Sequence, residues 1–409
     1  MKKIALICFF VIMMTALDTV SELSTRFTWI IPGYSTLSGF AGIVYAKPKE
    51  KGPDLILKSA NSNLNTMSND EMISVLEGNV VFLYDDAIIK SEYAKWWRSK
   101  GSVHFSNHVH VTKQQQDLTC DRLDYEKNKK LLRAEGNVDF YDGKEKTKLQ
   151  GSNADYYPDS KFVTVTGKPV LIHYDTVARD TMIIHGEKMT YSDSLKLATV
   201  DRNVTIYKGK LFTKCNNAKY YTEGNLAQLR GSPDIMYERD SLKGDSVNLM
   251  FTKRAMRGME VNGNSHGKYK DFSPRDTLLT DVAGDSMYMA FNDSGKIDSL
   301  WIYRNVKSTY RSLKDSLHVN EAYGKIMSVA FDKKGDVEKV RVWGNARSIY
   351  NVVEGDKGLN VASGDSIDVT FKTGKVSHVV LSGSVRGYYA PEKDNVPGEK
   401  PKKGAAFPK

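Results

Sequence analysis

The sequence predicts an all-β protein: an elongated, twisted β-jellyroll or solenoid of short antiparallel strands, open at both ends. Three observations lead to this prediction. Two short patterns recur along most of the chain, both alternate apolar and polar residues as a strand requires, and turn-forming pairs separate their copies. Helical periodicity is nearly absent after residue 75.

The first pattern is clearest in segments that begin at residues 244, 284, 324 and 364, a period of 40 residues, and read GDSVNLMF, GDSMYMAF, GKIMSVAF and GDSIDVTF. Copies with shorter spacing precede them: SEYAKW at 91, CDRLDY at 120, GSNADY at 151, GEKMTY at 186 and CNNAKY at 215. An apolar or small residue stands three places after the first residue and a large one five places after it. Those two positions lie on one face only in a strand.

Gly-Asp-Ser also surrounds the nucleophile of some esterases, so Ser246, Ser286 and Ser366 must be weighed as catalytic residues. A nucleophile does not recur at a fixed period, and no strand-turn-helix pattern surrounds any copy. We therefore interpret these serines as structural. No catalytic residue is predicted and we do not expect an enzyme.

The second pattern lies between copies of the first: EGNVVF at 77, EGNVDF at 135, GKPVLI at 167, DRNVTI at 201, RNVKSTY at 304, GNARSIY at 344 and GSVRGYY at 383. In two copies Val138 and Phe140, or Val204 and Ile206, alternate with a polar residue, which predicts apolar side chains inside and polar ones outside. Hairpin signals such as Asp142-Gly143 and Asn128-Lys129 connect the strands.

The chain divides into four parts by pattern and composition. Residues 1–46 resemble an export signal, with Lys2 and Lys3 before an apolar run from Ile4 to Leu17; a retained anchor is the alternative to cleavage. Residues 55–235 form the first half of the repeat array, and residues 236–390 continue it with the 40-residue period. Residues 391–409, rich in Pro, Lys and Gly, are predicted to be a flexible tail.

Charged, metal-ligating and thiol side chains give weaker signals. Lys and Arg outnumber Asp and Glu by 59 to 49, which suits an anionic partner, but the charges are scattered and a solvated surface explains most of them. His104, His108 and His110 are clustered, yet they should point outward with no third ligand assured, so no metal site is predicted. Cys120 and Cys215 share one repeat position about 14 Å apart, too far for a disulfide, and should be buried free thiols.

The segment Ala134-Glu135-Gly136-Asn137-Val138, with Gly-x-x-apolar-x-Tyr strands between its copies, resembles the OstA/LptA-like family of periplasmic lipopolysaccharide transport proteins. The resemblance is strongest over residues 55–235 and weaker to residue 390. It implies a jellyroll whose apolar interior holds the acyl chains of lipopolysaccharide, with no catalytic residue and no cofactor. It also implies a periplasmic location, free or associated with the inner or outer membrane. The partners it implies are lipopolysaccharide and other jellyroll proteins of the transport machinery, not nucleic acid.

An interior for acyl chains needs a continuous apolar wall. Strand alternation assigns eight candidates to that wall: Val138, Phe140, Tyr156, Val170, Ile172, Met189, Val204 and Ile206. The same alternation fits a filled core, which the residues alone favour, whereas the family resemblance favours a lipid groove. Two further functions stay open: a structural or adhesive envelope solenoid, and a polysaccharide-acting enzyme on a parallel β-helix.

A jellyroll that is open at both ends leaves unpaired backbone at its first and last strands. We expect these edges near residues 72–84 and 376–390. Such edges recruit further strands, which predicts head-to-tail association of this chain with itself or with related jellyroll proteins.

Overall fold

The computed structural model describes residues 55–391 except 85, 145, 158–159, 176–179, 193, 222–223, 238, 252–255, 273–276, 293–295, 316–317, 334, 353–356 and 373–374. The predicted export signal at 1–46 and, apart from Pro391, the predicted tail at 391–409 lie outside the described residues. The described residues form 26 strands in one sheet and no helix, and the paired strands are antiparallel. The predicted all-β class is confirmed.

The strands of the first half are β1 (Leu55–Ser59), β2 (Ser62–Ser68), β3 (Glu71–Tyr84), β4 (Ala87–Trp97), β5 (Ser102–Lys113), β6 (Gln116–Glu126), β7 (Leu131–Asp142), β8 (Thr147–Tyr157), β9 (Phe162–Thr166), β10 (Val170–Asp175), β11 (Asp180–His185) and β12 (Lys188–Ser192). Those that follow are β13 (Leu197–Lys208), β14 (Leu211–Tyr221), β15 (Leu226–Arg230), β16 (Asp234–Tyr237), β17 (Asp240–Lys243), β18 (Ser246–Phe251), β19 (Met256–Phe272), β20 (Thr277–Phe291), β21 (Ile297–Ser312), β22 (Asn320–Phe331), β23 (Val337–Val352), β24 (Gly358–Lys372), β25 (Lys375–Ser382) and β26 (Arg386–Pro391).

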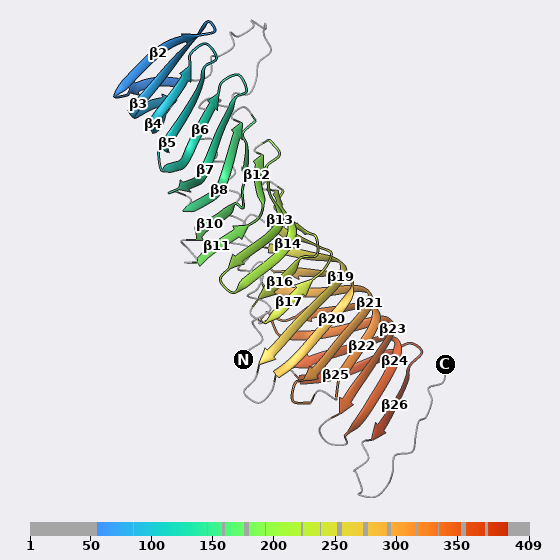
Figure 1. The fold of residues 1–409 in the computed structure, drawn as a ribbon. Coiled ribbons are helices and arrows are strands. Elements are labelled where there is room, and N and C mark those ends of the chain that lie inside the picture. The colour runs from blue at the N-terminus through green and yellow to red at the C-terminus, as the bar shows by residue number, and fades with distance from the viewer. Residues whose placement is uncertain are drawn as a thin grey trace, which may run out of the picture.

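The strands are stacked in chain order along a long, twisted molecule, from β2 at one end to β26 at the other (Figure 1). Long strands that follow one another in the sequence, such as β3 to β8, are neighbours in the sheet, and short turns such as 98–101 and 127–130 join them. A parallel β-helix has neither antiparallel pairs nor hairpin turns between them. The structure therefore rules out the parallel β-helix that the enzyme alternative required.

Long strands such as β7, β13 and β21 bend at the second sequence pattern, and we call the line of these bends the corner. At the corner two successive residues adopt left-handed backbone angles, as in Gly136 (φ 74°) and Asn137 (φ 45°), or Gly263 (φ 72°) and Asn264 (φ 45°). Glycine and asparagine tolerate this region best, which explains the recurring Gly-Asn. The two residues leave the ladder between Glu135 and Val138, so the strand turns there.

The first sequence pattern lies on the other side of the same corner. A Cβ atom on Gly284 would lie 2.5 Å from Cγ2 of Ile302, so the neighbouring strand leaves no room for a side chain there. Asn305 Nδ2 donates a hydrogen bond to Asp285 Oδ1 at 2.9 Å. Ser286 continues β20 and pairs with residues of β19 and β21. Gly-Asp-Ser is thus one half of a structural corner, as the repeat predicted.

The corner places the two halves of each strand in two facing layers. Layer A holds the halves that end at turns such as 98–101 and 127–130, and layer B the halves that end at turns such as 114–115 and 143–144. Phe82 of layer B contacts two rings of layer A, Trp96 and Phe105, with ring centroids 5.4 and 5.2 Å apart. Both rows of turns lie on the side opposite the corner, which we call the turn edge.

Two clusters of buried apolar side chains fill the space between the layers. The first contains residues of β3 to β12, from Leu76 to Met189, and the second contains residues of β13 to β24, from Val204 to Ile367. Val200 on β13 packs against both. The cores thus meet around β13, within one continuous sheet, whereas the division at residue 235 rests on the change of repeat length and stays a prediction.

The first free edge differs from the expected one. Strand β3 covers residues 72–84, but β1 and β2 pair with it, so the edge among the described strands is formed by residues 55–68. The reason is that Leu55–Ser68 lacks both repeat patterns and still extends the sheet in both layers. At the other end β25 and β26 pair only with β24 among the described strands, which agrees with the expected edge at 376–390.

The corner predicts a difference between two substitutions in one motif. Gly284→Ala should lower the free energy of unfolding by about 1–3 kcal/mol, because the added methyl group overlaps Ile302. Ser286→Ala should change it by no more than about 0.5 kcal/mol. Urea unfolding followed by tryptophan fluorescence measures both, and a serine variant as costly as the glycine variant would contradict the structural role of this motif.

Candidate functional site

The space between the layers in the first half contains a cavity of about 60 Å³. Side chains from layer A and layer B contribute to its wall, and all of the lining residues except Asp155 are apolar. They are Tyr84, Ala87, Ile89, Val111, Leu118, Leu123, Leu132, Ala134, Val138, Phe140, Leu149, Ala154, Asp155, Tyr156, Val163 and Val165. The cavity therefore offers an apolar ligand a continuous apolar wall.

Six of the eight wall candidates from the sequence lie in the interior. Val138, Phe140 and Tyr156 line the cavity. Met189 belongs to the first buried cluster and Val204 to the second, and Ile206 packs against the second. The structure brings three of the candidates together around one cavity and distributes the others along the core; their contact with lipid stays a prediction.

The inward orientation expected for Val170 and Ile172 is wrong by one residue. Leu171 packs against the first cluster and His173 is buried, whereas Val170 and Ile172 are half-buried and belong to neither cluster. The third residue of the corner pattern is the first inward position: Val138 holds it after Gly136-Asn137, and the buried Pro169 holds it after Gly167-Lys168. Counting from the valine instead of from the glycine shifted the assignment of β10.

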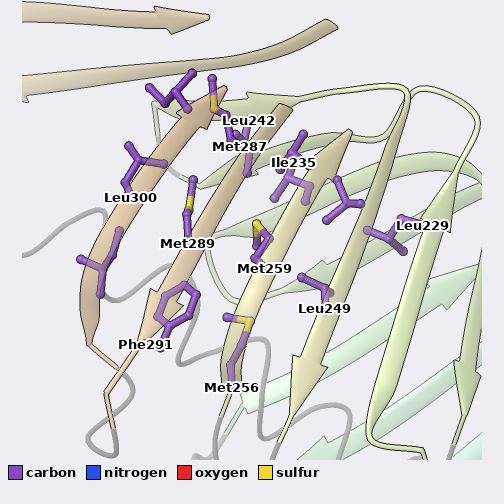
Figure 2. Close-up of a cluster of buried hydrophobic side chains, with 14 of the residues drawn as sticks. Leu229, Ile235, Leu242, Leu249, Met256, Met259, Met287, Met289, Phe291 and Leu300 are labelled. Carbon is purple, nitrogen blue, oxygen red and sulfur yellow. The ribbon is translucent and has the colours of Figure 1, made fainter. Parts of the chain in front are cut away.

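The interior of the second half has a different composition. Figure 2 shows Met256, Met259, Met287 and Met289 pointing into the core together with leucines, Ile235 and Phe291. Met327 adds a fifth methionine, whereas Met189 is the one methionine among the buried residues of the first cluster. Methionine side chains are flexible and polarizable, and they adapt to irregular or changing neighbours.

A row of polar side chains borders the interior of layer B at the turn edge. Lys113, Asp142, His173, Lys208 and Asp240 are all buried. The first four follow the apolar inward positions of their strands, and Asp240 begins β17, before the inward Leu242. Each needs a partner at such a site, and the contacts follow that expectation. Lys113 Nζ lies 2.5 Å from Asp86 Oδ1, Gln116 Nε2 donates to Asp142 Oδ2 at 2.8 Å, and His173 Nδ1 lies 2.9 Å from Thr147 Oγ1.

This polar row was not predicted, although the sequence contains a signal for it. Continuing the alternation by one step from Val109 and Val111, or from Val138 and Phe140, leads to Lys113 and Asp142. The inward face thus changes from apolar to charged at the last residue of the strand. An interior that is apolar at its centre and polar along one edge matches an amphipathic ligand.

The two layers touch close to the turn edge. Tyr84 ends β3 in layer B, Tyr125 lies near the end of β6 in layer A, and their ring centroids are 5.2 Å apart. Both side chains are buried. This pair closes the turn edge beside the cavity that Tyr84 also lines.

Two of the three clustered histidines, His104 and His110, contact carboxylates across the strand pair. His104 Nδ1 lies 2.7 Å from Asp124 Oδ1, and His110 Nε2 lies 3.0 Å from Asp117 Oδ1, whereas Val109 and Val111 point into the core. In the part of the chain that the structure describes, no group of three or more His, Cys, Asp and Glu side chains is placed to hold a metal ion. Nor does that part contain a helix of the length and hydropathy needed to cross a membrane.

The fold and interior define an all-β jellyroll with an apolar space between two layers and a polar border. Residues 59–196 match the model of a family described as LptA/(LptD N-terminal domain) LPS transport protein. The predicted resemblance to the OstA/LptA-like family is confirmed over these residues, which include every residue that lines the cavity.

A solved structure is also similar to part of this chain. It is the crystal structure of LptH, the LptA homologous periplasmic component of the conserved lipopolysaccharide transport device from Pseudomonas aeruginosa, at 14% identity and a TM-score of 0.27. The alignment covers 30% of this chain and 94% of LptH. A search of curated proteins found no match.

The cysteines give a prediction about reactivity. Cys120 and Cys215 are buried and free, as expected, and burial raises the pKa of each thiol to about 12. At pH 8 only about one thiol in ten thousand is then a reactive thiolate. Iodoacetamide should leave both unmodified in the folded protein and modify both in urea, as peptide mass spectrometry would show. Modification of the folded protein, or a disulfide between the two residues, would contradict this burial.

Proposed function

We propose that this chain is a periplasmic lipopolysaccharide-binding transport protein that shields lipid acyl chains between its two layers on the way to the outer membrane. One observation carries the proposal: the apolar cavity and its polar border lie within the residues that match a family of lipopolysaccharide transport proteins. The acyl chains would occupy the apolar interior. The anionic saccharide would stay at the polar turn edge or in solvent. This role requires no catalytic residue and no cofactor.

The driving force for such binding is burial of methylene groups. Each CH₂ removed from water contributes about 0.8 kcal/mol, so a chain with about ten buried methylenes gains about 8 kcal/mol. Val138, Phe140 and Tyr156 supply part of the necessary wall, together with Leu171 in place of Val170 and Ile172. Met189, Val204 and Ile206 would extend the path toward the second half.

The size of the cavity sets a condition on this function. A cavity of about 60 Å³ holds only a few water molecules and is too small for an acyl chain. The layers must therefore separate before a lipid enters, and the corner is the natural axis of that movement. Opening at the turn edge would part Tyr84 from Tyr125. Acyl chains that enter the space would then cover the apolar side chains that opening exposes.

The same small volume favours the second candidate function, a structural or adhesive envelope solenoid. A scaffold needs a filled core and no opening, and most of the interior is closely packed. The two functions differ in what happens at the turn edge, because a scaffold stays closed in the presence of lipopolysaccharide.

The partners we propose follow from the exposed ends of the sheet. At one end β2 is exposed along its whole length. At the other end β26 is exposed along its whole length, and Val379 on β25 and Tyr388 on β26 are more than half exposed. Edge strands of this kind pair with strands of other chains. We infer head-to-tail contacts with further copies or with related jellyroll proteins, which would join the interiors into a longer path.

A photo-crosslinking residue at two neighbouring positions tests the lipid path. Phe140 lines the cavity, whereas Asp139 points outward and contacts Lys148 and Gln150. In cells that make lipopolysaccharide, the residue at position 140 should capture it and the residue at position 139 should not, as immunoblots would show. Positions 206 and 205 form a second pair of this kind.

Two results would count against this path. Equal capture at both positions would place the lipid on the surface. Absence of capture at position 140 in a folded protein would identify the interior as a filled core. Circular dichroism of each variant checks that the fold is kept.

Proline substitutions test the association. Val379→Pro together with Leu381→Pro disrupts β25, which pairs with β24 and forms part of the free edge. Analytical ultracentrifugation should then show weaker association, while the opposite edge at β1 and β2 stays able to bind a strand. Assembly of the double variant equal to that of the wild type would argue against pairing at this end.

A further inference from the structure

The outer face of layer A carries a group of aromatic side chains on three strands near the second end of the molecule. They are Tyr288 on β20, Trp301 and Tyr303 on β21, and Trp343 on β23. Strand alternation places them outside, because their neighbours Met287, Ile302 and Val342 are buried in the core. We call these four side chains the outer aromatic group.

The rings of this group lie close together. Those of Trp301 and Tyr303 are nearly parallel, at 13°, with centroids 6.4 Å apart, and Trp343 stands perpendicular to Trp301 with centroids 5.8 Å apart. Tyr288 pairs with Trp301 across the strands. All four side chains are half-buried, so part of their surface remains accessible to solvent.

The fold does not require aromatic residues at these positions. The row of outward positions that contains Tyr288 and Trp301 can be followed back through the ladder to the first half. Between β5 and β19 this row holds polar pairs: His104 with Asp124, Arg133 with Asp155, Thr190 with Thr199, and Asn248 with Glu260. The row becomes aromatic only at β20 and β21, so corner and core impose no demand for these rings.

Polar groups surround the outer aromatic group. Ser328 lies between Trp301 and Arg341 in the ladder, and its small side chain leaves both larger neighbours accessible. Arg341 Nε donates a hydrogen bond to Asp368 Oδ1 at 2.6 Å, and Lys339 Nζ lies 3.1 Å from the same oxygen. Two cations thus face one carboxylate on the β23 side of the rings, whereas Glu260 lies beside Tyr288 on the β19 side.

We propose that the outer aromatic group, with Arg341 and Lys339, is a binding site for an anionic saccharide. The C–H groups on one side of a pyranose ring pack against the electron-rich face of an aromatic ring, and the sugar hydroxyl groups need charged or hydroxyl partners beside it. Arg341 can pair with a sugar carboxylate or phosphate. Because Ser328, Arg341 and Asp368 lie beside the rings, this surface is better suited to bind a saccharide than to bind an apolar surface of another protein.

The inference deepens the proposed function and rests on it for the source of the saccharide. The ligand is the carbohydrate part of lipopolysaccharide, held on the outside of layer A while acyl chains occupy the interior. Such a site would hold the headgroup of a transported molecule near the β26 end.

The test uses the purified chain and lipopolysaccharide from which all acyl chains have been removed, so that the interior has nothing to bind. Isothermal titration calorimetry should detect binding by the wild type. Trp301→Leu and Trp343→Leu should each weaken it by about tenfold, and Arg341→Ala should weaken it and reduce its dependence on salt. Trp301→Phe keeps an aromatic face and should bind within about threefold of the wild type.

Trp97→Leu is the matched control. Trp97 also lies on the outer face of layer A, half-buried beneath Lys95 Nζ at 5.0 Å, but on β4 at the far end. This variant should bind like the wild type. Circular dichroism excludes misfolding, and the phenylalanine variant separates loss of the ring from loss of the fold.

Three outcomes would overturn the inference. The first is no binding of the deacylated saccharide by the wild type, and the second is binding that Trp301→Leu and Trp343→Leu leave unchanged. The third is a change in self-association of these variants without any change in saccharide binding, which would make the group a protein contact. Lipid capture at position 140 is a separate measurement. Its failure would contradict the proposed lipid path and would not affect the result on saccharide binding.

Discussion

The bend of each strand at the corner is the constraint on which the rest of the structure depends. Two successive residues in the left-handed region, such as Gly136 and Asn137, turn the strand so that one half faces the other. The neighbouring strand then brings a small residue, most often glycine, close to the bend, as Gly284 does beside Ile302. Without the corner the same strands would form one flat sheet with an exposed apolar face. With it, the repeat builds two layers, an interior between them and a turn edge along which both layers end.

The interior reflects a balance between stability and access. Close packing of the layers stabilises the empty protein, and the cavity of about 60 Å³ shows how little space that packing leaves. A carrier for lipid exposes apolar side chains when it opens, and the acyl chains then cover them. The polar row at the turn edge, exemplified by Lys113 with Asp86, keeps charged groups where water or a headgroup can reach them once the layers separate. The methionines of the second core suit a space whose shape changes.

Much of the arrangement of inward and outward side chains could be predicted, because successive residues of a strand point to opposite faces of the sheet. The inward positions of Val138, Phe140 and Val204 could be predicted because in each case two apolar residues flank one polar residue. The orientation of β10 could not be assigned in that way, because proline replaces the valine of the pattern after Gly167-Lys168. The inward positions begin at Pro169, one residue before the apolar run that starts at Val170. The folding of each strand into two layers, and therefore the closeness of Tyr84 to Tyr125, depends on backbone angles that a period of two does not encode.

The proposed function requires that the layers separate at the turn edge to admit acyl chains. Lys129 and Lys144 are exposed and lie just beyond opposite ends of β7, one on the turn of each layer. Spin labels on cysteines introduced at these two positions report the separation by double electron–electron resonance, and the buried thiols of Cys120 and Cys215 should stay unlabelled. Separation of the layers should lengthen this distance when lipopolysaccharide is bound. An unchanged distance in a sample that demonstrably holds lipopolysaccharide would contradict it.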